Sequence, residues 1–138
     1  MARNRFVAEV LTPEGEIFNE EIEMLSTRTT IGSIGLLANH EPLLARLEPA
    51  ELRLYRSETD IVRFAQAEGY VQMSQNHALV LVEEALDPAS LNAAELTERV
   101  EAARRALDAA PAGSEEAARA QRDRRRAEAF LAIATGAH

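Results

Sequence analysis

The chain contains no cysteine among its 138 residues, so it has neither a disulfide framework nor a thiolate metal site. It also lacks lysine: all 15 basic residues are arginine, which fits a GC-rich coding sequence better than a phosphate-binding plan. No run approaches the ~18 apolar residues of a membrane-spanning helix, and the N-terminus lacks the apolar core of a signal peptide. These absences favour a cytoplasmic protein without direct membrane insertion.

The net charge is −8 and is unevenly distributed. Residues 1–86 hold 7 arginines and 14 acidic residues, whereas residues 87–138 hold 8 arginines and 9 acidic residues. Phosphate neutralisation dominates binding to nucleic acid. The acidic first part therefore argues against a nucleic-acid partner, and its charge is more simply explained as an aid to solubility.

Alternation of apolar and polar residues predicts short strands in the first part of the chain. Phe6, Ala8 and Val10, for example, fall on one face of the first such segment. Turn-forming residues separate the segments and stand at 12–15, 57–60 and 75–76. Seven to ten short strands with frequent turns predict a β-sandwich or flattened barrel over residues 1–86.

Helical signals replace this alternation after Asp87-Pro88. Asn92, with Glu95 three residues later, is a capping-box-like helix start. One apolar stripe follows, made of Leu96, Val100, Ala103 and Leu107. After a break, Ser114 caps a second helix whose predicted apolar face is Ala120, Ala127, Leu131 and Ala134. The overall prediction is an α+β chain that ends in an antiparallel helical hairpin over residues 87–138, with marginal, alanine-rich packing.

The most informative segment, residues 32–45, reads Gly-Ser-Ile-Gly-Leu-Leu-Ala-Asn-His-Glu-Pro-Leu-Leu-Ala. Two glycines three apart and a following proline predict a sharply shaped loop, because these residues have unusual backbone preferences. Its only histidine is His40, and it holds no paired acids or nucleophile motif. The segment therefore predicts a docking loop more than an active site.

This segment resembles the loop of the epsilon subunit of the rotary F-type ATP synthase (delta in mitochondrial naming), which reads Gly-x-hydrophobic-Gly-hydrophobic-x-x-x-His-x-Pro-Leu-Leu. Three later segments resemble family strands in the same order, at residues 47–54, 67–73 and 76–85. The resemblance implies a non-catalytic central-stalk subunit that couples ring rotation, driven by proton or sodium flow, to gamma. It implies no cofactor, and a peripheral location on the cytoplasmic face of the cell membrane.

The resemblance also implies the partners and the residues that meet them. Residues 1–86 would bind gamma and the rotor ring of c subunits, through a docking loop comprising Gly32, Ser33, Ile34, Gly35, Asn39 and His40. Ser33 stands where some members carry an acidic residue. Residues 87–138 would regulate, inhibiting ATP hydrolysis when the second helix meets the alpha and beta subunits of the catalytic head through Arg119, Arg122 and Arg126. The alternative for this arginine cluster is a solvated helix surface with i,i+4 ion pairs.

Some family members bind ATP at the start of the first helix through a hydrophobic-Asp-x-x-Arg-Ala motif. Here Asn92 replaces the acid and Glu95 the arginine, so an anion stands where a cation would face phosphate. The resemblance therefore implies no nucleotide binding by this chain.

Two rival functions come from other classes. A small β-sandwich enzyme or ligand-binding module lacks support because there are no paired acids around a histidine, no nucleophile motif and no metal-ligand spacing. An arginine-rich helical nucleic-acid binder is disfavoured by the net charge of −8.

Overall fold

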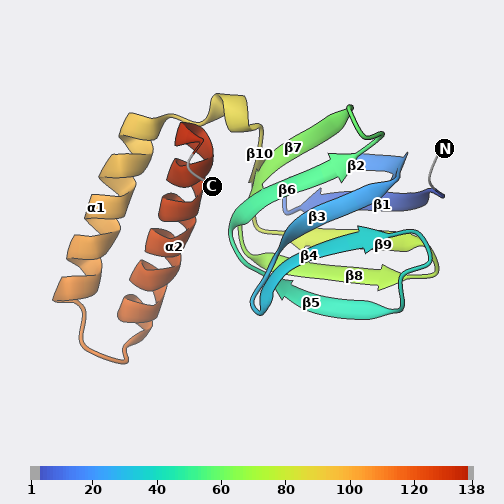
Figure 1. Cartoon of the computed structure of the whole chain (residues 1–138). Coiled ribbons are helices and arrows are strands. Elements are labelled where there is room, and N and C mark those ends of the chain that lie inside the picture. Colours follow the sequence, from blue (N-terminus) through green and yellow to red (C-terminus); the bar gives the residue numbers. More distant parts are fainter. Residues whose placement is uncertain (1–3, 137–138) are drawn as a thin grey trace. The chain divides into compact units, whose positions relative to one another are not determined.

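The computed structural model describes residues 4–136, which form a β-rich unit followed by two helices (Figure 1). The chain divides into these two compact units between Asp87 and Pro88. The predicted α+β class, a β-sandwich or flattened barrel followed by a helical hairpin, is confirmed.

The strands of the first unit form one hydrogen-bonded sheet in the order β10-β7-β6-β3-β5-β8-β9-β1-β2, with β4 paired to β3. They are β1 (Phe6–Thr12), β2 (Gly15–Ile22), β3 (Met24–Thr29), β4 (Gly32–Leu37), β5 (Leu43–Leu47), β6 (Ala50–Tyr55), β7 (Ile61–Gln66), β8 (Gly69–Ser74), β9 (His77–Val82) and β10 (Ala85–Leu86). β1 and β9 are parallel, and the other pairs are antiparallel. β3 and β5 share a single residue pair, Thr29 and Leu47, and there the sheet folds into two layers.

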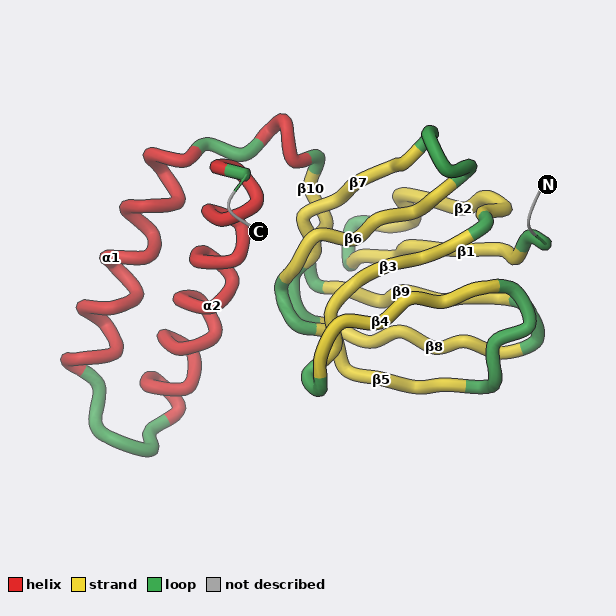
Figure 2. The backbone as a smooth tube through the Cα atoms, viewed as in Figure 1, coloured by secondary structure: helices red, strands yellow, loops and turns green. Residues whose placement is uncertain are grey.

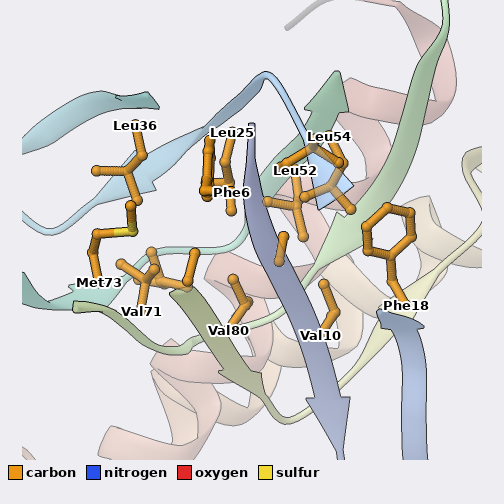
Figure 3. Close-up of a cluster of buried hydrophobic side chains, with 14 of the residues drawn as sticks. Phe6, Val10, Phe18, Leu25, Leu36, Leu52, Leu54, Val71, Met73 and Val80 are labelled. Carbon is orange, nitrogen blue, oxygen red and sulfur yellow. The ribbon is translucent and has the colours of Figure 1, made fainter. Parts of the chain in front are cut away.

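The two layers enclose the hydrophobic core, and Figure 3 shows side chains of several strands pointing toward one another. The alternation predicted for β1 is confirmed because Phe6, Ala8 and Val10 are all buried. Burying a large apolar side chain contributes roughly 1.5–3 kcal/mol. The other large, fully buried members of this core are Ile22, Leu25, Leu36, Leu52, Leu54, Val71, Met73 and Val80.

Two helices follow a 3₁₀ turn, η1 (Pro88–Ser90): α1 (Ala93–Ala109) and α2 (Glu115–Thr135), drawn in red in Figure 2. Both predicted N-caps are confirmed. The Asn92 side chain accepts a hydrogen bond from the Glu95 amide at 3.1 Å, and the Ser114 hydroxyl accepts one from the Ala117 amide at 3.1 Å. None of the helices within residues 4–136 is long and apolar enough to cross a membrane.

The hairpin packs through one narrow stripe on each helix. On α1 the predicted Leu96, Val100 and Ala103 are buried, whereas the predicted Leu107 is only half-buried. On α2 the buried residues are Ala120, Ala127, Phe130 and Ile133. The predicted face of α2 is therefore confirmed for Ala120 and Ala127 and wrong toward the C-terminus, where Leu131 and Ala134 are only half-buried. The helix turns toward Phe130 because this ring offers the largest apolar area to bury.

Candidate docking surfaces

The segment predicted as a docking loop is mostly a strand. β4 pairs with β3 along its whole length, from Thr29 opposite Gly32 to Met24 opposite Leu37, and only residues 38–42 form an irregular connection. The loop prediction is therefore wrong for Gly32, Ser33, Ile34 and Gly35. Gly32 alone of the two glycines has a positive φ, 129°, which the tight β3–β4 turn requires, whereas Gly35 fits ordinary strand backbone.

The predicted docking residues consequently lie along a line and do not form one cluster. Gly32 begins β4, and Asn39 and His40 follow its other end. At ~3.3 Å per residue, the extended strand alone separates Gly32 from Leu37 by about 17 Å. Among the described residues β4 pairs only with β3, so its other edge is free, and the strand contains no charged residue. Such an edge is suited to meeting a partner.

Ile31, which sequence reasoning missed, occupies the tip of the β3–β4 turn with 95% of its surface exposed. The buried Thr29 hydroxyl accepts from the Ile31 amide at 3.2 Å and donates to the Gly32 carbonyl at 2.8 Å. These bonds fix the turn that presents the isoleucine. The available signal was a β-branched apolar residue placed between turn-forming threonine and glycine.

His40 lies on the connection at the opposite end of β4 and is exposed. Its amide donates to the Leu37 carbonyl at 3.2 Å, and its ring Nδ1 lies 2.7 Å from the Glu41 carbonyl oxygen. The preceding residue, Asn39, has a φ of 66°, a conformation that asparagine tolerates better than most residues. The ring is thus oriented by main-chain contacts in a short, defined turn.

A second exposed surface covers the outer face of the layer formed by β5, β8, β9 and β1. The strand register aligns Tyr70 with Leu81 and Leu81 with Leu11, and sets Leu44 and Leu79 on either side of Gln72. We call Leu11, Leu44, Tyr70, Leu79 and Leu81 the apolar face. Leu44, Tyr70 and Leu81 rank among the exposed large hydrophobic residues, and a shallow groove runs between Leu11, Tyr70 and Leu81. A face of this kind marks an interaction surface.

The outer face of the other layer carries a cluster of paired charges. The Glu51 carboxylate accepts hydrogen bonds from Arg53 Nε and, at 3.1 Å, from Arg63 Nη1. The hydrogen bond that Arg53 donates to Glu51 raises the pKa of the Arg53 guanidinium. The face that carries the apolar residues also holds Arg46, opposite Tyr70, and the paired Glu9 and His77. Its exposed large apolar side chains are the groups that gain most from being covered.

The arginines of α2 separate into two groups. Arg124 Nε donates to Glu128 at 2.8 Å, and this hydrogen bond raises the pKa of Arg124, so the solvated ion-pair reading holds for that residue. Arg119 and Arg122 are exposed, and the part of the chain that the structure describes gives neither of them an ion pair. Arg126 is half-buried, so the prediction that it lies on a face apart from the hairpin packing is wrong for this residue.

Among residues 4–136, no group of three or more metal-ligating side chains lies together. Asn92, which replaces the acidic residue of the family's nucleotide motif, has its side-chain oxygen occupied as the N-cap of α1. The exposed surfaces offer shape, apolar area and charge for recognition.

Comparison with known proteins gives a consistent result. Residues 5–88 match the model of the family described as "ATP synthase, Delta/Epsilon chain, beta-sandwich domain". The ATP synthase epsilon chain of Rhodospirillum rubrum is 33% identical over 93% of this chain and 95% of its own length. That of Persephonella marina is 35% identical over 78% and 74%, and that of Halalkalibacterium halodurans is 32% identical over 91% and 89%.

Two solved structures share the fold. One is a chain of the Euglena gracilis mitochondrial ATP synthase complex of OSCP, F1 and c-ring, with a TM-score of 0.79, 16% identity and coverage of 100% of this chain and 85% of that chain. The other comes from the central stalk and c-ring of the Tetrahymena thermophila enzyme, with a TM-score of 0.61, 18% identity and coverage of 99% and 98%. The sequence matches decide the family: this chain belongs to the delta/epsilon chains of ATP synthase.

Proposed function

We propose that this chain is a non-catalytic central-stalk subunit of a bacterial F-type ATP synthase. In this role the β-sandwich connects gamma to the membrane rotor ring, so that ion flow through the ring turns gamma. The chain would then sit peripherally at the cytoplasmic face of the cell membrane. Family membership supports this role, as does the presence of structural neighbours in ATP synthase complexes that include the central stalk and the c-ring.

The observation that carries the proposal is the set of large apolar side chains exposed on one outer face of the sandwich. On the other outer face, Glu51 is matched by Arg53 and Arg63. The apolar face leaves Leu44, Tyr70 and Leu81 in water. A subunit that must stay attached to a rotating shaft needs a broad apolar contact of this type, and we assign the apolar face to gamma.

The free edge of β4 is the surface we assign to the rotor ring. It is uncharged, and its two ends present Ile31 and His40 on fixed turns. Contacts at both ends of a strand edge are separated in space, so they resist rotation of the partner relative to the sandwich. This arrangement suits the transmission of torque. This assignment replaces the single docking loop with an extended element.

The helical hairpin is proposed as a brake on ATP hydrolysis. Its buried stripe combines alanines, whose burial contributes little per residue, with larger side chains such as Phe130 and Ile133. Helices that separate must therefore replace these contacts with new ones on the catalytic head. Arg119 and Arg122 then offer exposed positive charge to an acidic segment of the alpha and beta subunits. ATP has no part in this regulation, because Asn92 and Glu95 replace the nucleotide-binding residues.

The experiment that tests the coupling role compares proton pumping with ATP hydrolysis in the assembled synthase. Ser33→Arg and His40→Arg place bulky charges at the two ends of β4 and should reduce ATP-driven pumping while hydrolysis by the soluble head continues. Glu58→Arg, in the exposed 57–60 turn, is the control. Normal ATP-driven pumping in both Ser33→Arg and His40→Arg would refute the assignment of the β4 edge to the rotor ring.

A further inference from the structure

The connection between β4 and β5 has little apolar packing to hold it in place. Asn39, His40, Glu41 and Pro42 are all exposed. Segments with few buried contacts are the first parts of a domain to open. A turn that must be ordered when it binds a partner loses affinity through that ordering, so a docking turn benefits from being fixed beforehand.

Two asparagines supply such a fixation. The Asn39 amide donates to the Asn76 side-chain oxygen at 2.5 Å, and Asn76 Nδ2 donates to the Asn39 side-chain oxygen at 3.1 Å. A carboxamide carries both a donor and an acceptor, so the two residues satisfy each other across 37 positions of sequence. Both adopt positive φ, 66° for Asn39 and 59° for Asn76, which asparagine tolerates.

Asn76 is itself anchored in the sandwich. Gln75 and Asn76 form the two-residue β8–β9 turn, and positive φ at both positions is typical of a rigid hairpin turn. The Asn76 carbonyl accepts a hydrogen bond from the Val7 amide of β1 at 3.0 Å. Figure 1 shows the β8–β9 turn and the β4–β5 connection at the same end of the sandwich. The bonds thus form a continuous path from β1 through both asparagines to the His40 turn.

We infer that Asn39 and Asn76 are positioning residues, which lock the His40 turn in the shape that docks on the rotor ring. The inference rests on the proposed function and changes the role of one residue. The backbone amide and the side-chain oxygen of Asn39 both bond to Asn76. Asn39 therefore acts by positioning His40, and does not itself contact the rotor ring. Asn76, which lies outside the predicted docking residues, becomes part of the docking device.

Hydrogen exchange of the Asn39 amide in the isolated full-length chain tests the lock. Asn76→Gly keeps the positive φ but removes the carboxamide, and it should accelerate exchange roughly thirtyfold, the effect of losing two hydrogen bonds of ordinary net strength. Asn76→Asp keeps the acceptor but loses the donor, so its exchange rate should lie between those of the wild type and Asn76→Gly. Gln75→Gly, at the neighbouring position with positive φ, is the matched control and should leave the rate unchanged. An unaltered rate in Asn76→Gly would overturn the lock.

The ratio of protons pumped to ATP hydrolysed in the assembled synthase tests the consequence. Asn76→Gly should lower this ratio, Asn76→Asp should restore part of it, and Gln75→Gly should match the wild type. If Asn76→Gly accelerates exchange but pumps normally while His40→Arg does not, the positioning role is refuted and the proposed function stands. If neither variant impairs pumping, the proposed ring contact fails as well.

Discussion

Removing Leu44 and Leu81 from the apolar face should weaken binding of the isolated chain to the gamma subunit. At ~0.8 kcal/mol per buried CH2, truncating a leucine to alanine removes about 2.4 kcal/mol of burial. Leu81 has 45% and Leu44 has 70% of its surface left to bury in a complex. These fractions correspond to about 1.1 and 1.7 kcal/mol, or an affinity lower by about 100-fold for the double variant.

Isothermal titration calorimetry of the full-length variant against soluble gamma, at fixed salt, measures this change. Leu37→Ala is the matched control, because Leu37 is 46% exposed, close to the 45% of Leu81, but lies on the outer side of β4 in the other layer. The single variants Leu37→Ala and Leu81→Ala should each lower the free energy of unfolding by about 1.3 kcal/mol, because about half of each leucine side chain is already buried in the sandwich. Equal gamma affinity for Leu37→Ala, Leu81→Ala and the wild type would refute the assignment of gamma to the apolar face.

Three further outcomes are expected. A chain truncated after Leu86 should remain folded and β-rich and still bind gamma, as judged by far-UV circular dichroism, thermal melting and calorimetry; a flat melt would contradict this. Gly69→Ala should lower the free energy of unfolding by about 3 kcal/mol or more, measured by urea titration, because its Cβ would lie 1.9 Å from the Leu81 carbonyl oxygen. Replacing Arg119 and Arg122 by alanine should relieve inhibition of ATP hydrolysis by the reconstituted head, by about 1–2 kcal/mol at low salt and less at high salt, and equal inhibition would show a purely solvated surface.

The strands were predictable where one face of the sheet is buried and the other is exposed. Phe6, Ala8 and Val10 show this alternation plainly, and their burial confirms it. β4 was not predictable in the same way, because its two glycines have no side chains to alternate. Its identity as a strand depends on pairing with β3, a contact that local sequence does not reveal.

The same limit applies to the candidate surfaces. Leu44, Tyr70 and Leu81 come from three strands, and only the register places them on one face. Asn76 carries no recognisable motif, since its role arises from a contact with Asn39 across the fold. Helix caps such as Asn92 and Ser114 were predictable because their partners lie three residues away.

The parallel pairing of β1 with β9 has a consequence for the order in which the protein is built. β1 is the first strand of the sandwich to be synthesised, yet its inner neighbour, which begins at His77 opposite Val7, is among the last strands of the sandwich. Closure over so long a loop is slow, and until then the β1–β2 hairpin exposes unpaired strand edges. Charged residues on an edge strand discourage pairing with other chains, and β2 carries Glu16, Glu20 and Glu21. The acidity of this strand would thus protect the nascent chain from aggregation before the sandwich closes.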